Sequence, residues 1–141
     1  MIVYNDISDV DLPILEDQLY IYVLENSPQG NIKIGRTTNI KQRLHSLSGS
    51  NSGGNHISRI AVSKPTYLYS LETTAHTHYH RYRINGTEWF DGKYVTFDEV
   101  VNYINSLFDQ RCYNLCNETR RKFNEERNIK YNERSINDWL T

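Results

Sequence analysis

Two short apolar runs joined by a turn constrain the fold more than any other feature of the sequence. Residues 19–24 (LYIYVL) are rich in aromatic and β-branched side chains, which is typical of a buried strand. Residues 31–35 (NIKIG) alternate polar and apolar side chains directly after the turn-forming residues 27–30. The sequence therefore predicts a β-hairpin within residues 19–35.

Two helical patterns and a third strand follow the hairpin. Asn39 can cap a helix with Gln42 at the capping-box position, and this helix should end at Gly49. Residues 57–62 (ISRIAV) indicate a third strand, and residues 66–83 contain no Gly or Pro, which predicts the longest core helix. A further capping box at residues 96–99 (TFDE) predicts the last helix. The expected fold class is α+β, with a small mixed or antiparallel sheet of about three strands flanked by helices.

Charge divides the chain into three parts. Residues 1–18 carry five acids and no Lys or Arg, residues 19–90 carry eight bases and three acids, and residues 91–141 are nearly balanced. We expect an acidic extension at 1–18 that is disordered or packed on a sheet edge, a catalytic domain at 19–109, and a charged, partly helical extension at 110–141. The basic surplus of the middle part favours phosphate binding, although the whole chain has a net charge of −1.

Several classes of protein are disfavoured by the sequence. The N-terminus is acidic and resembles no signal peptide, and no apolar run approaches the roughly 20 residues that span a bilayer. We therefore expect a soluble, intracellular protein without a membrane partner. Cys112 and Cys116 stand four residues apart, which fits neither a disulfide framework nor a CxxC zinc site, so reduced thiols are expected.

Five sequence elements in residues 19–90 resemble the GIY-YIG nuclease superfamily. They are Tyr20-Ile21-Tyr22, the glycine of Lys33-Ile34-Gly35, Arg43 in the first helix, Glu72 in the second, and the later Gly86-x-Glu88-Trp89-Phe90. Gly35 follows Tyr22 by thirteen residues, and Arg43 follows Gly35 by eight. The run from Lys33 to Leu44, together with Glu72-x-x-x-His76 and the later Gly86-x-Glu88-Trp89-Phe90, is similar to the phage-associated branch of that superfamily.

The resemblance implies a metal-dependent DNA endonuclease in which water attacks phosphorus directly with the help of one Mg²⁺ or Mn²⁺. Tyr22 would help to activate the water, Arg43 would be the catalytic arginine, and Glu72 would be the metal-binding carboxylate. Gly35 would let the backbone pass close to the site. Lys33 stands where most of the superfamily has a second tyrosine, and the first motif lacks its glycine.

The chemistry of these side chains points to the same reaction. Glu72 could hold one Mg²⁺ whose other ligands are water and phosphate, and Arg43 offers a planar, charged fork that matches phosphate oxygens. Tyrosine has a pKa near about 10, so Tyr22 is a poor base unless a cation or metal-bound water assists it. Lys33 could be that cation or, if desolvated, the base itself.

Other residues are expected around this centre. His76 follows Glu72 by four positions on the same helix face, as a second base, a leaving-group acid or a DNA contact. Tyr20 and Trp89 are expected to be structural. Further nucleic-acid contacts are predicted from Arg36, Lys41 and Arg83, of which Arg83 should share the helix face of Glu72.

The partners expected from this interpretation are duplex or branched DNA in the cytoplasm of a bacterial or infected host cell. Double-strand cleavage would need a homodimer or two sequential events. One alternative is a nucleic-acid- or protein-binding module that kept the fold and lost turnover. Another is an interaction protein that neutralises a partner through the acidic N-terminus. Residues 119–127 mix charges, as in a solvated helix face or a DNA-binding or dimerising arm.

Overall fold

A five-stranded antiparallel sheet organises the protein. The computed structural model describes residues 1–50 and 56–111 of the chain. The strands lie in the order β1-β4-β2-β3-β5, and every neighbouring pair is antiparallel. Their bounds are Ile2–Tyr4 (β1), Tyr20–Ser27 (β2), Ile32–Thr37 (β3), His56–Val62 (β4) and Trp89–Phe90 (β5). The α+β class is confirmed, and two short edge strands, β1 and β5, extend the three-stranded sheet that was expected.

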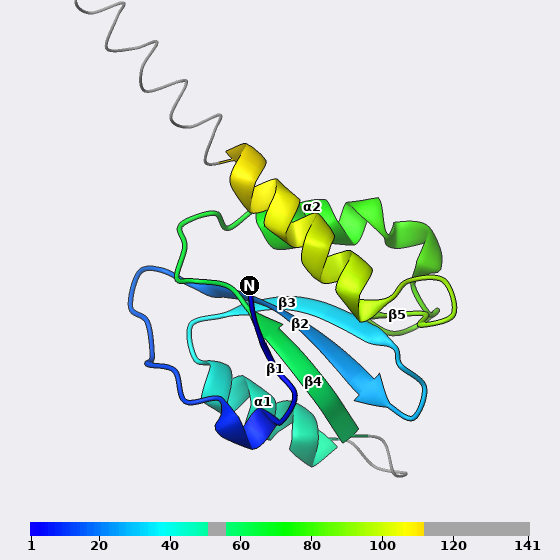
Figure 1. The fold of residues 1–141 in the computed structure, drawn as a ribbon, viewed down its shortest axis with the longest axis horizontal. Helices are drawn as coiled ribbons and strands as arrows, with labels where there is room; N and C mark the ends of the chain where they lie inside the picture. Colours follow the sequence, from blue (N-terminus) through cyan, green and yellow to red (C-terminus); the bar gives the residue numbers. More distant parts are fainter. Residues whose placement is uncertain (51–55, 112–141) are drawn as a thin grey trace, which may run out of the picture. The chain divides into compact units, whose positions relative to one another are not determined.

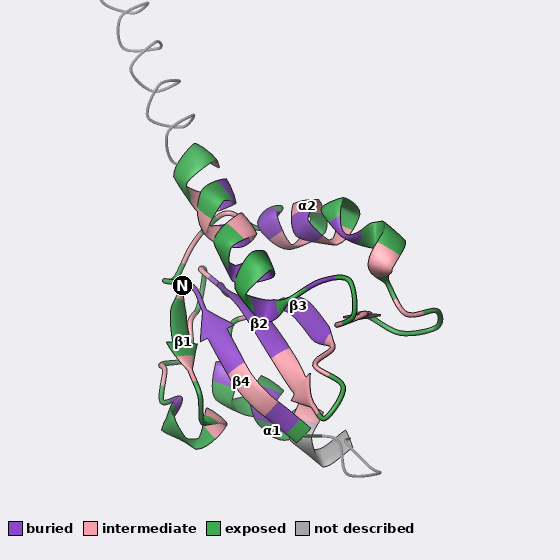
Figure 2. Ribbon diagram, turned by 45° about the vertical axis from the view of Figure 1, so that its right-hand side comes forward, coloured by how far each residue is buried: buried purple, intermediate pink, exposed green. Residues whose placement is uncertain are grey.

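Helices cover both faces of this sheet. Figure 1 shows α1 (Ile40–Ser50) on one side, with α2 (Leu71–His78) and the helix that begins at residue 97 on the other. Two 3₁₀ helices, Ile7–Asp9 and His80–Tyr82, complete the elements. Because successive strand side chains alternate between faces, Tyr20, Tyr22 and Leu24 point toward α1. The central strands are buried on both faces, as Figure 2 shows.

The predicted hairpin and the predicted cap are both present. β2 pairs with β3 from Tyr20 opposite Thr37 to Glu25 opposite Ile32. The backbone N–H of Gln42 donates to the Asn39 side chain at 3.0 Å, which is the N-cap half of the predicted capping box. The Asn39 backbone N–H donates to the Thr37 hydroxyl at 3.1 Å rather than to the Gln42 side chain. The helix that this cap begins buries Ile40 and Leu44 in the core.

The predicted single helix at residues 66–83 is wrong. Thr66 instead forms a two-way backbone pair with Leu19, with N–O distances of 2.9 and 3.0 Å, so the chain is extended there. α2 starts only at Leu71 and ends at His78, and a 3₁₀ turn follows. The absence of Gly and Pro permits a helix, but pairing with Leu19, just before β2, decides the conformation of Thr66.

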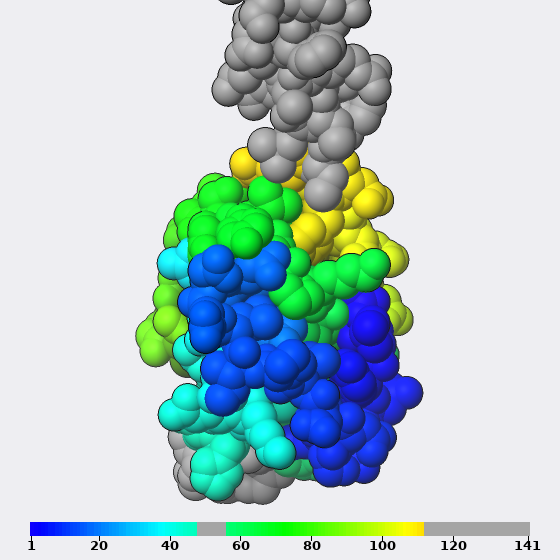
Figure 3. Space-filling view, turned by 90° about the vertical axis from the view of Figure 1, so that its left-hand side faces the viewer, coloured from blue at the N-terminus to red at the C-terminus, as the bar shows by residue number. Residues whose placement is uncertain are grey.

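The acidic N-terminal segment packs against the domain. β1 pairs with β4 at the sheet edge, and Val10 is buried. The Leu15 backbone N–H donates to the Thr38 carbonyl at 2.9 Å, and the Tyr69 hydroxyl donates to the Asp17 carbonyl. Figure 3 shows this segment in blue, lying beside the cyan start of α1 and the green 64–70 region. The edge-packed arrangement is thus the one found.

The expectations for the C-terminal region mostly lie outside the described residues. These are the charged helical extension beyond residue 111, the arm at 119–127 and the two cysteines. The helix predicted after residue 96 is present, and the Thr96 hydroxyl accepts from the Glu99 backbone N–H at 3.2 Å. Across the described part of the chain, no helix combines the length and apolar character needed to cross a bilayer.

Candidate catalytic site

Tyr22 and Gly35 lie directly opposite each other on β2 and β3. A Cβ atom added at Gly35 would stand 2.3 Å from both Cζ and the hydroxyl oxygen of Tyr22. No real side chain can occupy that space, so the tyrosine ring lies across the glycine backbone. Gly35 of the second motif therefore leaves the space that the Tyr22 ring of the first motif occupies.

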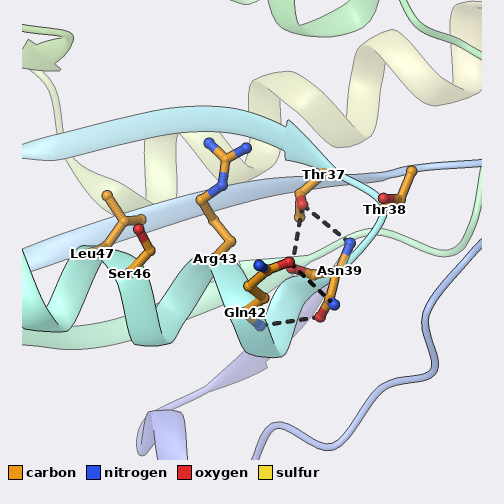
Figure 4. Close-up of a pocket in the computed structure, with 7 residues that line it drawn as sticks. All are labelled: Thr37, Thr38, Asn39, Gln42, Arg43, Ser46 and Leu47. Carbon is orange, nitrogen blue, oxygen red and sulfur yellow. Dashed lines mark hydrogen bonds between the residues drawn. The ribbon is translucent and has the colours of Figure 1, made fainter.

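Arg43 reaches this tyrosine from α1. Its Nη1 donates to the Tyr22 hydroxyl at 3.5 Å, a long contact that leaves most of the guanidinium uncommitted. Figure 4 shows Arg43 projecting from α1 toward β3. Arg43 borders a polar pocket of about 460 Å³. The pocket is lined by Thr37, Thr38, Asn39, Gln42, Arg43, Ser46 and Leu47. Arg43 is thus accessible to an anionic ligand.

The charge state of Tyr22 follows from its surroundings. Burial raises the pKa of its hydroxyl, and the guanidinium of Arg43 opposes that rise. The carboxylates of Glu72 and Glu88 raise the pKa further. Tyr22 is therefore a neutral phenol at neutral pH, and proton transfer to it requires additional positive charge.

Glu72 stands on α2 between Arg36 and His76. Its Oε2 lies 3.2 Å from Nε of Arg36 on β3, and its Oε1 lies 3.5 Å from Nε2 of His76. Arg36 also donates to the Tyr69 carbonyl at 2.9 Å. The Glu72 side chain is 26% exposed, so its oxygens remain accessible. These contacts attach α2 to the same strand that carries Gly35.

His76 anchors α2 to β3 through one of its ring nitrogens. Its Nε2 lies 2.7 Å from the Ile34 carbonyl, which can only accept, so Nε2 carries a hydrogen. The hydrogen bond to Glu72 raises the pKa of His76, the bond to Ile34 does so less strongly, and burial opposes both. The ring also packs against Phe90, with centroids 5.3 Å apart.

Lys33 forms an ion pair that the sequence did not reveal. Its Nζ lies 2.6 Å from Oε2 of Glu88, and its side chain is only 8% exposed. Register explains the pairing, since Lys33 lies opposite Trp89 on β5, next to Glu88. Glu88 was expected only as part of a motif. Only the β3–β5 pairing, which a two-residue strand hardly signals, could have identified it.

Three other predicted residues have structural contacts. The Tyr20 hydroxyl donates to the Pro13 carbonyl at 2.7 Å, which anchors the N-terminal segment. Trp89 packs against the core beside Lys33, with the ammonium 6.0 Å from its ring centre. Lys41 is exposed on the first turn of α1.

The predicted helical placement of Arg83 is wrong, because α2 ends at His78 and Arg83 follows the 3₁₀ turn. Its Nε donates to the Thr87 carbonyl at 2.7 Å. Arg83 nevertheless remains within electrostatic reach of the site, since its charge lowers the pKa values of both His76 and Glu88.

Glu72 is the residue of this site that could hold a hard divalent cation. Among residues 1–50 and 56–111, no three His, Cys, Asp or Glu side chains gather into a metal cage. Glu72 supplies an accessible carboxylate, and Mg²⁺ commonly takes one or two carboxylates and fills its other positions with water and phosphate oxygens. Arg36, whose side chain is 47% exposed, is the partner that such a cation would displace.

The fold and this cluster define an α+β domain with an arginine, a carboxylate and a buried tyrosine around the central hairpin. The chain belongs to the T5orf172 domain family, whose model matches residues 19–106, well over half of the chain. This phage-associated family is consistent with a nuclease or DNA-binding role. Comparisons with curated proteins and with solved structures found no match.

Proposed function

We propose that this protein is a metal-dependent DNA endonuclease of the GIY-YIG type, which hydrolyses phosphodiester bonds by direct attack of water. The observation that carries the proposal is the contact of Arg43 with Tyr22 above Gly35. The motif spacing in the sequence and membership of a phage-associated domain family support it.

The side chains divide the work of phosphodiester hydrolysis. Arg43 would bind the nonbridging phosphate oxygens with its free N–H groups and stabilise charge that develops in the transition state. The Tyr22 hydroxyl would orient the attacking water by hydrogen bonding, and Lys33 would add a fixed positive charge beside it. A Mg²⁺ or Mn²⁺ ion on Glu72 would supply Lewis-acid stabilisation of the phosphate.

Plasmid cleavage in Mg²⁺ or Mn²⁺ tests the proposal directly. Wild type should cut duplex or branched DNA, and Glu72→Gln, which keeps the side-chain volume, should cut at least about 100-fold more slowly. Mn²⁺ binding, followed by the electron paramagnetic resonance of the free ion, should weaken in the same variant.

Glu16→Gln serves as the matched control, because Glu16 is an exposed acid of the N-terminal segment. It should cut and bind Mn²⁺ like wild type. Equal cutting by wild type and Glu72→Gln on every substrate would refute the enzyme proposal.

A second candidate function is a DNA-binding module without turnover. The raised pKa of Tyr22 and the lysine at the position of the second tyrosine favour it. Salt-dependent DNA binding that survives Glu72→Gln, with no cleavage by wild type, would establish this alternative.

A further inference from the structure

Lys33 is the one charged side chain that is buried among the residues the structure describes. A buried ammonium is costly unless a partner compensates it. Glu88 is that partner, at 2.6 Å, and its own side chain is 68% exposed. The pair therefore extends from the buried interior of the sheet face to solvent.

The two partners are brought together by strand pairing. Lys33 belongs to β3 and Glu88 precedes β5, whose Trp89 lies opposite Lys33. The ammonium also lies over the Trp89 ring, 6.0 Å from its centre. A lysine side chain has several rotatable bonds, so the contact with Glu88 is what gives its ammonium a fixed direction.

The pair lies on the same face of the sheet as the tyrosine. Lys33 and Gly35 are two residues apart on β3, and Gly35 lies opposite Tyr22. The Glu88 carboxylate raises the pKa of Tyr22, and electrostatic interaction with His76 and Arg83 lowers the pKa of Glu88 itself. Glu88 thus interacts with residues from both sides of the candidate site.

From this geometry we propose that Glu88 is a positioning residue, which directs the Lys33 ammonium toward the reacting phosphate. The Lys33–Glu88 pair, rather than Lys33 alone, fills the place of the second tyrosine. This inference rests on the proposed function. One ammonium hydrogen is committed to Glu88, and the other two are available to a phosphate oxygen or to water.

The Lys33–Glu88 pair explains how a lysine can replace the second tyrosine of the motif in a catalytic site. The Glu88 carboxylate balances the added charge, so the substitution does not leave an isolated cation in the core. It also sets where the remaining donors point. Lys33 then serves as a directed donor whose effect is on the rate of the bound complex more than on DNA affinity.

Cleavage kinetics of four variants test the proposal. Glu88→Ala should lower kcat about 10-fold with KM changed less than about 2-fold, because positioning acts within the bound complex. Glu88→Gln, which keeps an oxygen acceptor, should recover most of that loss. Lys33→Ala should be slower than either. The double variant Lys33→Ala/Glu88→Ala should be no slower than Lys33→Ala, since Glu88 acts through the lysine.

Asp98→Asn is the matched control. Asp98 is also an exposed acid in an ion pair, with its oxygen 3.5 Å from Arg59 and its side chain 78% exposed. This variant should leave kcat and KM unchanged. Losses that multiply in the double variant, or a kcat unchanged in Glu88→Ala, would overturn the positioning role.

A measurement without DNA separates this inference from the proposed function. In ¹⁵N-labelled protein, the Lys33 ammonium should give a slowly exchanging signal, identified by its loss in Lys33→Arg. The signal should persist in Glu88→Gln and broaden in Glu88→Ala. An unchanged signal in Glu88→Ala would overturn the pairing, whereas a wild type that pairs but never cuts would contradict the proposed function instead.

Discussion

The two faces of the sheet each carry a cation–carboxylate pair, and the pairs differ in what they leave free. On the face away from α1, Arg59 donates through Nε and Nη2 to both oxygens of Glu25, at 2.9 and 3.2 Å. The guanidinium also lies 4.3 Å from the ring centre of Phe97. On the α1 face, Lys33 contacts a single oxygen of Glu88.

The difference separates a structural pair from one with spare binding capacity. The fork of Arg59 is matched to the Glu25 carboxylate, also pairs with Asp98 and stacks on an aromatic ring, so its donors serve the fold. Lys33 has two further N–H groups, and Arg43 on the same face makes one long contact with Tyr22. Lys33 and Arg43, rather than Arg59, are therefore the cations expected to bind substrate.

The largest expected effect comes from removing one arginine from each face. Arg43→Ala should slow cleavage by about 10²- to 10³-fold with little change in the free energy of unfolding, because it stabilises the transition state. Arg59→Ala should do the reverse, leaving kcat unchanged and destabilising the fold by about 1–2 kcal/mol. Plasmid cleavage and urea unfolding of both variants measure this contrast. A cleavage defect of equal size in both would abolish the distinction between the faces.

The next effect concerns the closest packing on the α1 face. Gly35→Ala should destabilise the protein by about 1–3 kcal/mol and impair cleavage, since the new Cβ displaces the Tyr22 ring. Gly86→Ala is the comparison, because Gly86 has a φ of 77° but no atom within 4 Å of an added Cβ. It should lose about 1 kcal/mol through backbone strain and keep its activity. Urea unfolding and cleavage rates compare them, and full activity in Gly35→Ala would contradict the ring placement.

The smallest effect is a pH dependence of stability. The hydrogen bond from Lys33 holds the pKa of Glu88 below its ordinary value of 4.5. The stabilisation is therefore present above pH 4.5 and is lost as pH falls below 4.5 through the folded-state pKa. Wild type should exceed Glu88→Gln in stability at pH 7, and the gap should close near pH 3. Urea titrations at the two pH values test this, and a gap that widens in acid would give the wrong sign.

Local sequence signals predicted the parts of the fold that depend on neighbours in the chain. The β2–β3 hairpin follows from alternation and a turn, and the Asn39 cap acts over three residues. The prediction of one helix at 66–83 was wrong because the conformation of Thr66 depends on pairing with Leu19, which is distant in the sequence. β1 was not expected as a strand because only its pairing with β4 holds it.

The candidate site divides in the same way. Motif spacing pointed to Tyr22, Arg43 and Glu72, and the structure gives Tyr22 and Arg43 a direct contact. Whether they act as proposed stays a prediction. Glu88 was missed because its partner lies 55 residues earlier, across a two-residue strand. Arg83 was misplaced because its position depended on the length of α2.

The crossing of Tyr22 over Gly35 has a consequence for redesign of this domain. Exposed positions such as Lys41 and Ser46 on α1 can be varied widely in a library aimed at altered DNA preference. Position 35 offers no such freedom, because every side chain begins with the Cβ atom that the tyrosine excludes. A library that also varies position 35 would consist mostly of variants with a displaced Tyr22 ring. Gly35 should therefore be kept while exposed positions of α1 are varied.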